Sequence, residues 1–300
     1  MKMAVSICAE TPLVARIADY VELTKPRIAV LVLVTVGVGA LLAAGRSVDV
    51  ALLIHAVAGT ALVAAGASAL NQLLERTRDA KMRRTENRPL PAGRLQPFEV
   101  LLFGLLLAAV GIAYLVVALP KPTAAIVAAA TFVGYVAVYT PLKSVTTLNT
   151  MIGAIPGAMP PVIGWTAVRG EVGPEALTLF AILFLWQLPH FLAIAWIYRD
   201  DYARAGYRML PVVDPDGRRT ARRMAVYCVL LLAASLAPVF FGHAHGLYLA
   251  GAVLLGLGFL ARALAFGAER SDRHARKVLR ASLLYLPGLL ALLLLDRTLF

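Results

Sequence analysis

The chain has 300 residues, of which 60% are hydrophobic and 15% charged, and its formal net charge at pH 7 is +12. A soluble domain is typically about 45–50% apolar and about 25% charged, so this composition excludes an ordinary soluble domain. The positive charge could suggest nucleic acid, but such binding needs a basic groove with stacking aromatic residues on a soluble fold. Here the basic residues lie in loops between apolar runs. We therefore expect a polytopic, all-α membrane protein that binds no nucleic acid.

Neither the cysteines nor the N-terminal segment indicates another class. Cys8 and Cys228 are far apart and belong to no CxxC or Cys/His pattern, so neither a disulfide nor a zinc site is indicated. The N-terminal stretch lacks the apolar core of a signal peptide and carries acidic residues, so no secretory or transit peptide is evident. Residues 1–300 are expected to form a single intramembrane domain.

Nine apolar runs follow one another along the chain, each near the roughly 20 residues that cross about 30 Å of hydrocarbon. The predicted spans are 28–45, 51–71, 98–119, 122–139, 149–167, 176–198, 222–241, 246–266 and 279–296. Of the 29 Lys and Arg residues, 25 fall on the N-terminal side of these spans and four, namely Arg46, Lys121, Arg169 and Arg297, on the other. Since cytoplasmic loops carry the basic excess, the N-terminus is expected in the cytoplasm and the C-terminus outside.

Two loops rich in acids, 72–97 and 199–221, fall on the expected cytoplasmic side. Each follows the second helix of a set of four, spans 1–4 and spans 5–8, which suggests an internal duplication without clear sequence self-similarity.

The first loop begins in the stretch "NQLLERTRDAKMRRTENRPL". If the second span continues as a helix, Asn71, Glu75 and Asp79 stack along one of its faces. Their hard oxygens suit Mg²⁺, which is typically shared with substrate phosphates. Arg83, Arg84 and Arg88 follow, and guanidinium groups match phosphate oxygens bidentately. The pattern predicts a diphosphate site, and the alternative is a solvated loop whose arginines only set the topology.

The second loop repeats acids followed by arginines. Asp200 and Asp201 end the sixth span, and Arg204 and Arg208 follow within two turns. Two such clusters on one side of the membrane can converge across a cavity, as two metal sites on one diphosphate require. The alternative is that Asp201 and Arg204 form a simple surface pair.

Polar and helix-breaking residues also lie inside the spans. Gln187 and His190 in "WQLPHF" are expected to share a face about 12 Å inside the cytoplasmic end of the sixth span, where polar pairs normally face a cavity. The fifth span, "GAIPGAMPPVIGW", is expected to be broken and to form a pocket wall. His55 is expected to be satisfied by a neighbour, and the Ala and Gly runs of the first three spans to serve helix packing.

These motifs resemble the UbiA-type intramembrane prenyltransferases. The family pattern N-x-x-x-D-x-x-x-D-x-x-M-x-R-T-x-x-R-P-L is matched here by Asn71, Glu75, Asp79, Met82, Arg84, Thr85, Arg88, Pro89 and Leu90. Within the family, the segments "LTKPRI" (23–28), 140–167, 186–196 and 201–213 resemble the haem O synthase branch in order and spacing. The resemblance covers roughly residues 20–295 and implies nine helices around a central cavity.

The resemblance implies transfer of farnesyl from farnesyl diphosphate to a vinyl group of haem B, with water addition, to give haem O and diphosphate. It implies Mg²⁺ as cofactor, held by Asn71, Glu75, Asp79 and Asp201. The resemblance implies that these four residues and His190 are the catalytic residues. Substrate contacts would come from Arg84, Arg88, Lys143, Gln187, Arg204 and Arg208.

The implied location is the bacterial cytoplasmic (inner) membrane, with haem A synthase or terminal oxidase assembly as further partners. Two departures stand out: Glu75 replaces the usual Asp, and Tyr207-Arg208 replaces the usual Ile-Pro before "MLP". Both departures bear on the geometry of the metal site.

Two rival functions share some of these features. A quinone-type aromatic prenyltransferase has the same metal motif, but should have residues near the fifth span that orient a small aromatic acid. A membrane transporter also has broken helices and intramembrane polar residues, but does not need two acid motifs coupled to arginines. Metal-dependent release of diphosphate would separate either enzyme from a transporter.

Overall fold

The computed structural model describes residues 13–45 and 47–299, so Cys8 and Arg46 lie outside the described residues. Within those ranges, nine helical stretches are long and apolar enough to cross a membrane. The prediction of an all-α protein with nine spans is confirmed. The spans run over Pro26–Ala44, Val50–Asp79, Pro97–Ala118, Thr123–Leu142, Asn149–Arg169, Pro174–Ile197, Arg218–Phe240, Gly246–Ala268 and Asp272–Leu299.

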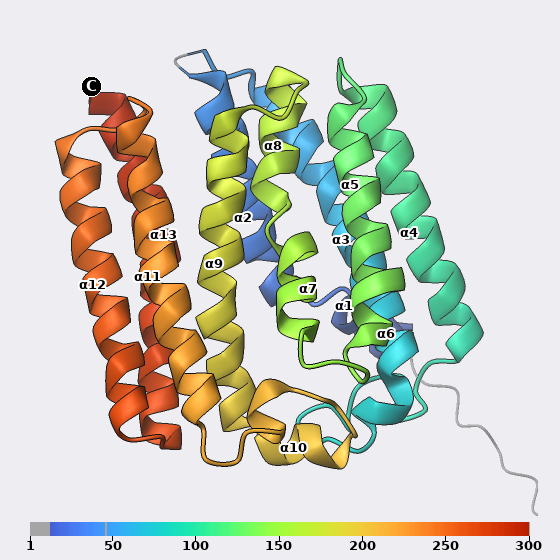
Figure 1. The fold of residues 1–300 in the computed structure, drawn as a ribbon. Helices are drawn as coiled ribbons and strands as arrows, with labels where there is room; N and C mark the ends of the chain where they lie inside the picture. The colour runs from blue at the N-terminus through green and yellow to red at the C-terminus, as the bar shows by residue number, and fades with distance from the viewer. Residues whose placement is uncertain (1–12, 46, 300) are drawn as a thin grey trace, which may run out of the picture.

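Most spans are single helices, but the fourth and fifth are composite (Figure 1). The single ones are α2 (Pro26–Ala44), α3 (Val50–Asp79), α4 (Pro97–Ala118), α9 (Pro174–Ile197), α11 (Arg218–Phe240), α12 (Gly246–Ala268) and α13 (Asp272–Leu299). The fourth span joins α5 (Thr123–Val133), the π-helical turn η1 (Gly134–Tyr139) and α6 (Thr140–Leu142). The fifth joins α7 (Asn149–Gly157) and α8 (Pro160–Arg169), and three short helices lie outside the spans: α1 (Leu13–Leu23), α10 (Arg199–Arg204) and η2 (Leu210–Val212).

The break in the fifth span confirms the sequence prediction and has a simple cause. Pro160 and Pro161 have no backbone N–H, so they cannot continue the hydrogen bonding of α7, but they fit the first turn of α8. The chain turns at Ala158 and Met159 between the two helices. The fifth span therefore reaches the end of the bundle that carries loops 72–97 and 199–221 as a short, separate helix (Figure 1).

Glycine allows α8 to lie directly against α2. A Cβ atom on Gly164 would lie 1.9 Å from the carbonyl oxygen of Val36, and one on Gly39 would lie 2.1 Å from that of Pro161. Only glycine permits this approach of two backbones. The expectation that the small residues of the early spans serve packing is confirmed at this crossing.

The elements form two flanks around a centre (Figure 1). α11, α12 and α13 lie together on one side, α4 and α5 on the other, and α2, α7, α8 and α9 between them. The largest apolar core joins α9 to the three C-terminal helices through Leu192, Cys228, Phe259 and Tyr285.

Both charged loops lie at one end of the bundle, and the C-terminus lies at the opposite end (Figure 1). The two loops also contact one another, because Met82 of the first packs in one apolar cluster with Tyr202, Ala205, Tyr207 and Met209 of the second. The prediction that both loops share a side is confirmed. We call this end of the molecule the charged end.

Candidate active site

One face of α3 carries three polar residues that are almost fully buried. α3 continues as a helix to Asp79, as the sequence predicts, so Asn71, Glu75 and Asp79 follow at four-residue steps. Their exposed fractions are 2%, 3% and 2%. A buried carboxylate is costly unless it has a charged or hydrogen-bonding partner, so the partners of this face define the site.

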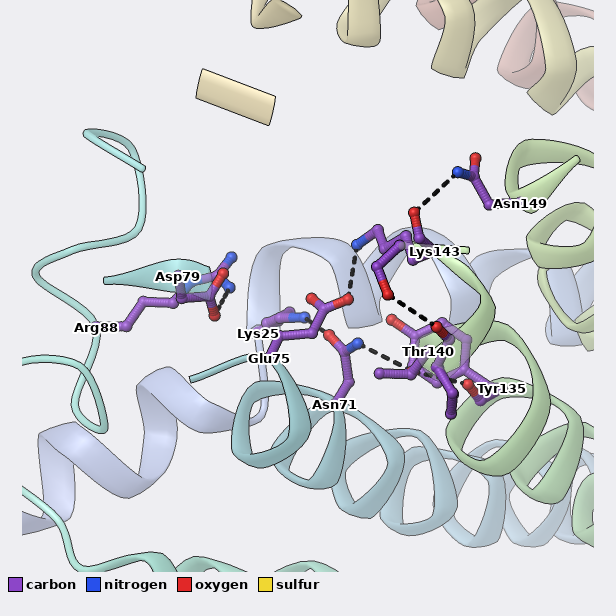
Figure 2. Close-up of polar contacts among 11 residues, drawn as sticks. Lys25, Asn71, Glu75, Asp79, Arg88, Tyr135, Thr140, Lys143 and Asn149 are labelled. Carbon is purple, nitrogen blue, oxygen red and sulfur yellow. Dashed lines mark hydrogen bonds and ion pairs between the residues drawn. The ribbon is translucent and has the colours of Figure 1, made fainter. Parts of the chain in front are cut away.

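Each of the three residues is paired with a different cation (Figure 2). The Lys143 ammonium donates to Glu75 Oε1 at 2.9 Å, and Arg88 donates to Asp79 Oδ2 at 2.7 Å. The Lys25 ammonium donates to Asn71 Oδ1 at 3.0 Å. The carboxylate face of α3 therefore meets basic residues from three other segments: the start of α2, the first charged loop and the end of the fourth span.

The π-helical turn of the fourth span faces the same site. Asn71 donates through Nδ2 to Thr140 Oγ1 at 3.2 Å, and Thr140 donates to the Tyr135 carbonyl oxygen at 2.9 Å (Figure 2). π-Helical turns in α-helices frequently occur at functional sites, because they redirect side chains that a regular helix would point elsewhere. The Tyr139 ring lies over Gly153 of α7, where a Cβ atom would come within 2.4 Å of it.

Lys25 holds an unusual backbone conformation. Among the described residues other than glycine, it alone has a positive φ, of 50°. Such conformations cost free energy and persist where the surrounding structure imposes them. Burial, together with the nearby Arg88 guanidinium, lowers the pKa of Lys25 to about 8. Pro26, the first residue of α2, follows directly and fixes where the helix begins.

The Lys143 ammonium stays charged in this setting. Burial alone would lower its pKa, but Tyr139 and the Glu75 carboxylate hold the pKa of Lys143 well above its ordinary value. Its position is set by Asn149, which has no exposed surface. The Asn149 amide lies within hydrogen-bonding distance of the carbonyl oxygens of Lys143, Thr146 and Arg208, at 3.1, 2.8 and 3.1 Å. Asn149 therefore ties the Lys143 turn to the second charged loop.

Cation–π contacts, as well as apolar contacts, join the second charged loop to the first. The Arg84 guanidinium lies 4.9 Å from the centroid of the Tyr198 ring, and that of Arg78 lies 5.6 Å from the centroid of Tyr207. These cation–π contacts and the Met82 cluster hold α10 beneath the charged end of α3.

In this structure the acids of the two loops do not come together, and their convergence on one diphosphate stays a prediction. Asp201 pairs with Arg204, the local alternative that the sequence left open, and Asp200 is exposed. Over the part of the chain that the structure describes, no three His, Cys, Asp or Glu residues gather as a ready metal cluster. Each of these three acids is instead ion-paired with a cation: Glu75 with Lys143, Asp79 with Arg88, and the less buried Asp201 with Arg204.

The donor set on α3 nevertheless fits Mg²⁺. Mg²⁺ is usually bound through one or two carboxylates plus substrate phosphates rather than by an all-protein cage. Glu75 and Asp79 supply two carboxylates and Asn71 an amide oxygen, on one helix face. The cations paired with them are suited to phosphate oxygens, so a diphosphate with its metal could exchange partners with these ion pairs.

The predicted pair in α9 does not share a neighbour. Gln187 donates to the Ala154 and Leu183 carbonyl oxygens at 3.4 and 3.0 Å and faces α7. His190 pairs through Nδ1 with Ser282 Oγ of α13 at 2.8 Å and stacks on Trp186. Three residues along a helix leave the two side chains about 60° apart around its axis, which here brings them against different helices. That both face one cavity stays a prediction. His55 pairs with the Tyr114 hydroxyl at 2.7 Å, as expected.

The remaining predicted residues lie around the site. Arg83 and Arg84 are exposed, as are Arg204 and Arg208, and Arg208 reaches the Val145 carbonyl oxygen at 3.4 Å. Sequence reasoning missed the roles of several residues that the fold brings to the site: Lys25, Arg78, Tyr135, Tyr139, Thr140 and Asn149. Lys25 alone carried a usable signal, as a basic residue directly before the proline that opens a span.

Fold and site together define a multi-pass membrane protein with a buried carboxylate and cation site at one end of its helices. Residues 32–286 match the UbiA prenyltransferase family. The chain is 48% identical over 288 residues to a protoheme IX farnesyltransferase of Solibacter usitatus, covering 93% of this chain and 98% of that one. The chain belongs to the UbiA prenyltransferase family and is therefore a prenyltransferase.

Solved structures share its fold. A digeranylgeranylglyceryl phosphate synthase superposes with a TM-score of 0.80 at 16% identity, over 95% of this chain and 100% of that one. A UbiA homologue from Archaeoglobus fulgidus, bound to GPP and Mg²⁺, superposes with a TM-score of 0.63 at 15% identity, over 92% of this chain and 99% of the other.

Proposed function

We propose that this chain transfers the farnesyl group of farnesyl diphosphate to a vinyl group of haem B. Water adds in the same reaction, and the products are haem O and diphosphate. The observation that carries the proposal is the buried face of α3, whose carboxylates are paired with Lys143 and Arg88. The relative from Solibacter usitatus, named protoheme IX farnesyltransferase, supports haem as the acceptor.

The chemistry explains why cations and acids are needed together. When the allylic C–O bond breaks, its electron pair stays on the diphosphate, whose negative charge increases. Lys143, Arg88 and Lys25 lie around the face on which that charge would develop, and preorganised cations in a partly dry site stabilise it strongly. The vinyl carbon then bonds to the allylic cation, and the porphyrin-side cation is captured by water, which loses a proton.

The proposal includes Mg²⁺ on the α3 face. Asn71, Glu75 and Asp79 would hold it together with diphosphate oxygens, and Asp201 would join them once released from Arg204. The metal would supply positive charge to the leaving diphosphate. The Archaeoglobus fulgidus homologue, bound to GPP and Mg²⁺, supports this assignment through its fold alone.

For the acceptor, we propose that haem contacts His190 on α9. Its Nδ1 is engaged by Ser282, which leaves Nε2 as the nitrogen for an axial contact or for the water that quenches the cation. Gln187 and Arg84 would contact the substrates from α9 and the first loop, and Arg204 and Arg208 from the second loop.

We further propose that the charged end faces the cytoplasm of a bacterium. The excess of Lys and Arg on that side supports this orientation in the cytoplasmic membrane. Farnesyl diphosphate would then enter at the charged end, with its apolar tail among the helices. Haem A synthase or terminal oxidase assembly would receive the product.

The decisive experiment uses the purified chain with haem B, farnesyl diphosphate and Mg²⁺. Mass spectrometry should detect haem O, and diphosphate should appear in equal amount. Omission of haem B should suppress diphosphate release. If the enzyme prenylates hydroxybenzoate and leaves haem B unchanged, the proposal is wrong and the aromatic prenyltransferase function replaces it.

A further inference from the structure

Tyr207 carries a buried hydroxyl group that has no partner. The residue is 2% exposed, and its Oη is one of three buried side-chain polar atoms in the described chain without a hydrogen bond, the others being Gln72 Oε1 and Trp196 Nε1. A buried phenol usually finds a partner, because an unsatisfied polar group is costly. Such a hydroxyl is completed either by an internal water or by a bound ligand.

The surroundings of Tyr207 indicate the charge of that group. The Lys143 ammonium lies 5.2 Å from the centroid of the Tyr207 ring, and the Arg78 guanidinium lies 5.6 Å from it. Because the same Lys143 ammonium donates to Glu75, the Tyr207 ring lies next to the carboxylate face of α3. The Glu75 and Asp79 carboxylates also lie near Tyr207, but each is already ion-paired, Glu75 with Lys143 and Asp79 with Arg88. An anion that bound beside these cations could accept a hydrogen bond from the phenol hydroxyl.

The ring is held firmly enough to direct its hydroxyl. Tyr202 packs on it edge to face, with centroids 5.8 Å apart, and Met82, Ala195, Ala205 and Met209 belong to the same apolar cluster. The preceding Gly206 has a φ of 72°, a conformation that glycine adopts without strain, and it turns the chain so that Tyr207 points inward. The Tyr207 amide closes this turn on the Tyr202 carbonyl oxygen at 3.0 Å.

We propose that the Tyr207 hydroxyl donates a hydrogen bond to a phosphate oxygen of the bound prenyl diphosphate. The inference rests on the proposed function, because it assigns a further diphosphate contact in the same site. Tyr207 thus supplements the cations with a neutral donor from the second charged loop.

The test measures binding of inorganic diphosphate with Mg²⁺ by calorimetry, so it needs no haem. Tyr207→Phe removes only the hydroxyl and should weaken diphosphate binding about ten-fold or more, since hydrogen bonds to charged groups are among the stronger ones. The KM for farnesyl diphosphate should rise in parallel. Tyr202→Phe, in the same cluster, is the matched control and should bind diphosphate as the unmodified chain does.

The outcomes separate this inference from the function on which it rests. If the unmodified chain binds no diphosphate, the proposed function fails. If it binds diphosphate and Tyr207→Phe binds equally well, only the role of Tyr207 is wrong, and an internal water satisfies the hydroxyl. Tyr207→Leu, which keeps an apolar side chain, provides a second variant should Tyr207→Phe not fold, and it should lose the same affinity.

Discussion

Lys143 and Glu75 are 68 positions apart in the chain, yet the Lys143 ammonium lies 2.9 Å from Glu75 Oε1. Glu75 is almost fully buried, so this pair neutralises a carboxylate that water does not reach. The pair also joins the fourth span to α3 at the charged end. In the proposed reaction Glu75 binds Mg²⁺ and Lys143 stabilises the leaving diphosphate. Substitutions at the two positions should therefore have different effects.

Lys143→Gln should lower turnover of farnesyl diphosphate about 100-fold, as loss of one preorganised donor to a developing negative charge typically does. Lys143→Arg, which keeps the charge, should retain part of the activity. Steady-state release of diphosphate is the measurement. Lys121→Gln, at the opposite end of the bundle, is the control, and normal turnover in Lys143→Gln would exclude the ammonium from the reaction.

Asp79→Ala and Asp201→Ala should each abolish Mg²⁺-dependent turnover, because each removes a proposed metal ligand that no neighbour replaces. Glu75→Asp should be mild, since the carboxylate remains. Thermal unfolding in detergent should show that the variants stay folded. A near-normal Mg²⁺-dependent rate in Asp79→Ala would remove that residue from the metal site.

His190→Ala should change the optical spectrum of bound haem B or reduce formation of haem O, as expected if its imidazole contacts the acceptor. Ser282→Ala separates this role from a structural one, because it removes the partner of Nδ1 and leaves the ring in place. We expect Ser282→Ala to affect haem binding less than His190→Ala does. A His190→Ala variant with an unchanged haem spectrum and a normal rate would contradict the assignment.

The orientation of the chain can be tested by cysteine labelling after replacement of Cys8 and Cys228. Glu86→Cys in the first charged loop should react only from the cytoplasmic side, and Thr298→Cys near the end of α13 only from the outside. A membrane-impermeant thiol reagent on intact cells and on inverted vesicles makes the distinction. Labelling of both positions from the same side would overturn the orientation.

Asp214→Ala should destabilise the charged end of α11. Asp214 Oδ2 accepts from both the backbone N–H and the hydroxyl of Thr220, each at 2.7 Å, and so caps the first turn of this helix. Loss of such a cap typically costs about 1 kcal/mol, which a lower Tm in detergent would report. An unchanged Tm would show that water replaces the carboxylate.

The same cap has a defined pH dependence. Burial tends to raise the pKa of Asp214, but the hydrogen bonds from Thr220 outweigh it and hold that pKa below its ordinary value. The cap therefore stabilises the fold above the unfolded-state pKa of about 4 and loses its effect as pH falls through the lower folded-state pKa. The Tm difference between the unmodified chain and Asp214→Ala should shrink below about pH 4.

Local patterns determined much of this protein. The length and apolarity of the runs predicted the nine spans, and the prolines at 160 and 161 predicted the break in the fifth, because both depend on the chemistry of neighbouring residues. The four-residue spacing of Asn71, Glu75 and Asp79 placed them on one helix face for the same reason. The duplication of spans 1–4 and 5–8 stays a prediction.

Only the tertiary structure decided which partner each polar group has. Asp201 lies in a motif that matches the first loop, yet it pairs with Arg204, while Glu75 pairs with a lysine from a distant turn. Gln187 and His190 are close in sequence but face α7 and α13. A buried charge or hydroxyl is costly in free energy unless it has a partner. Which partner lies within reach depends on how the helices pack, and no local sequence pattern encodes that packing.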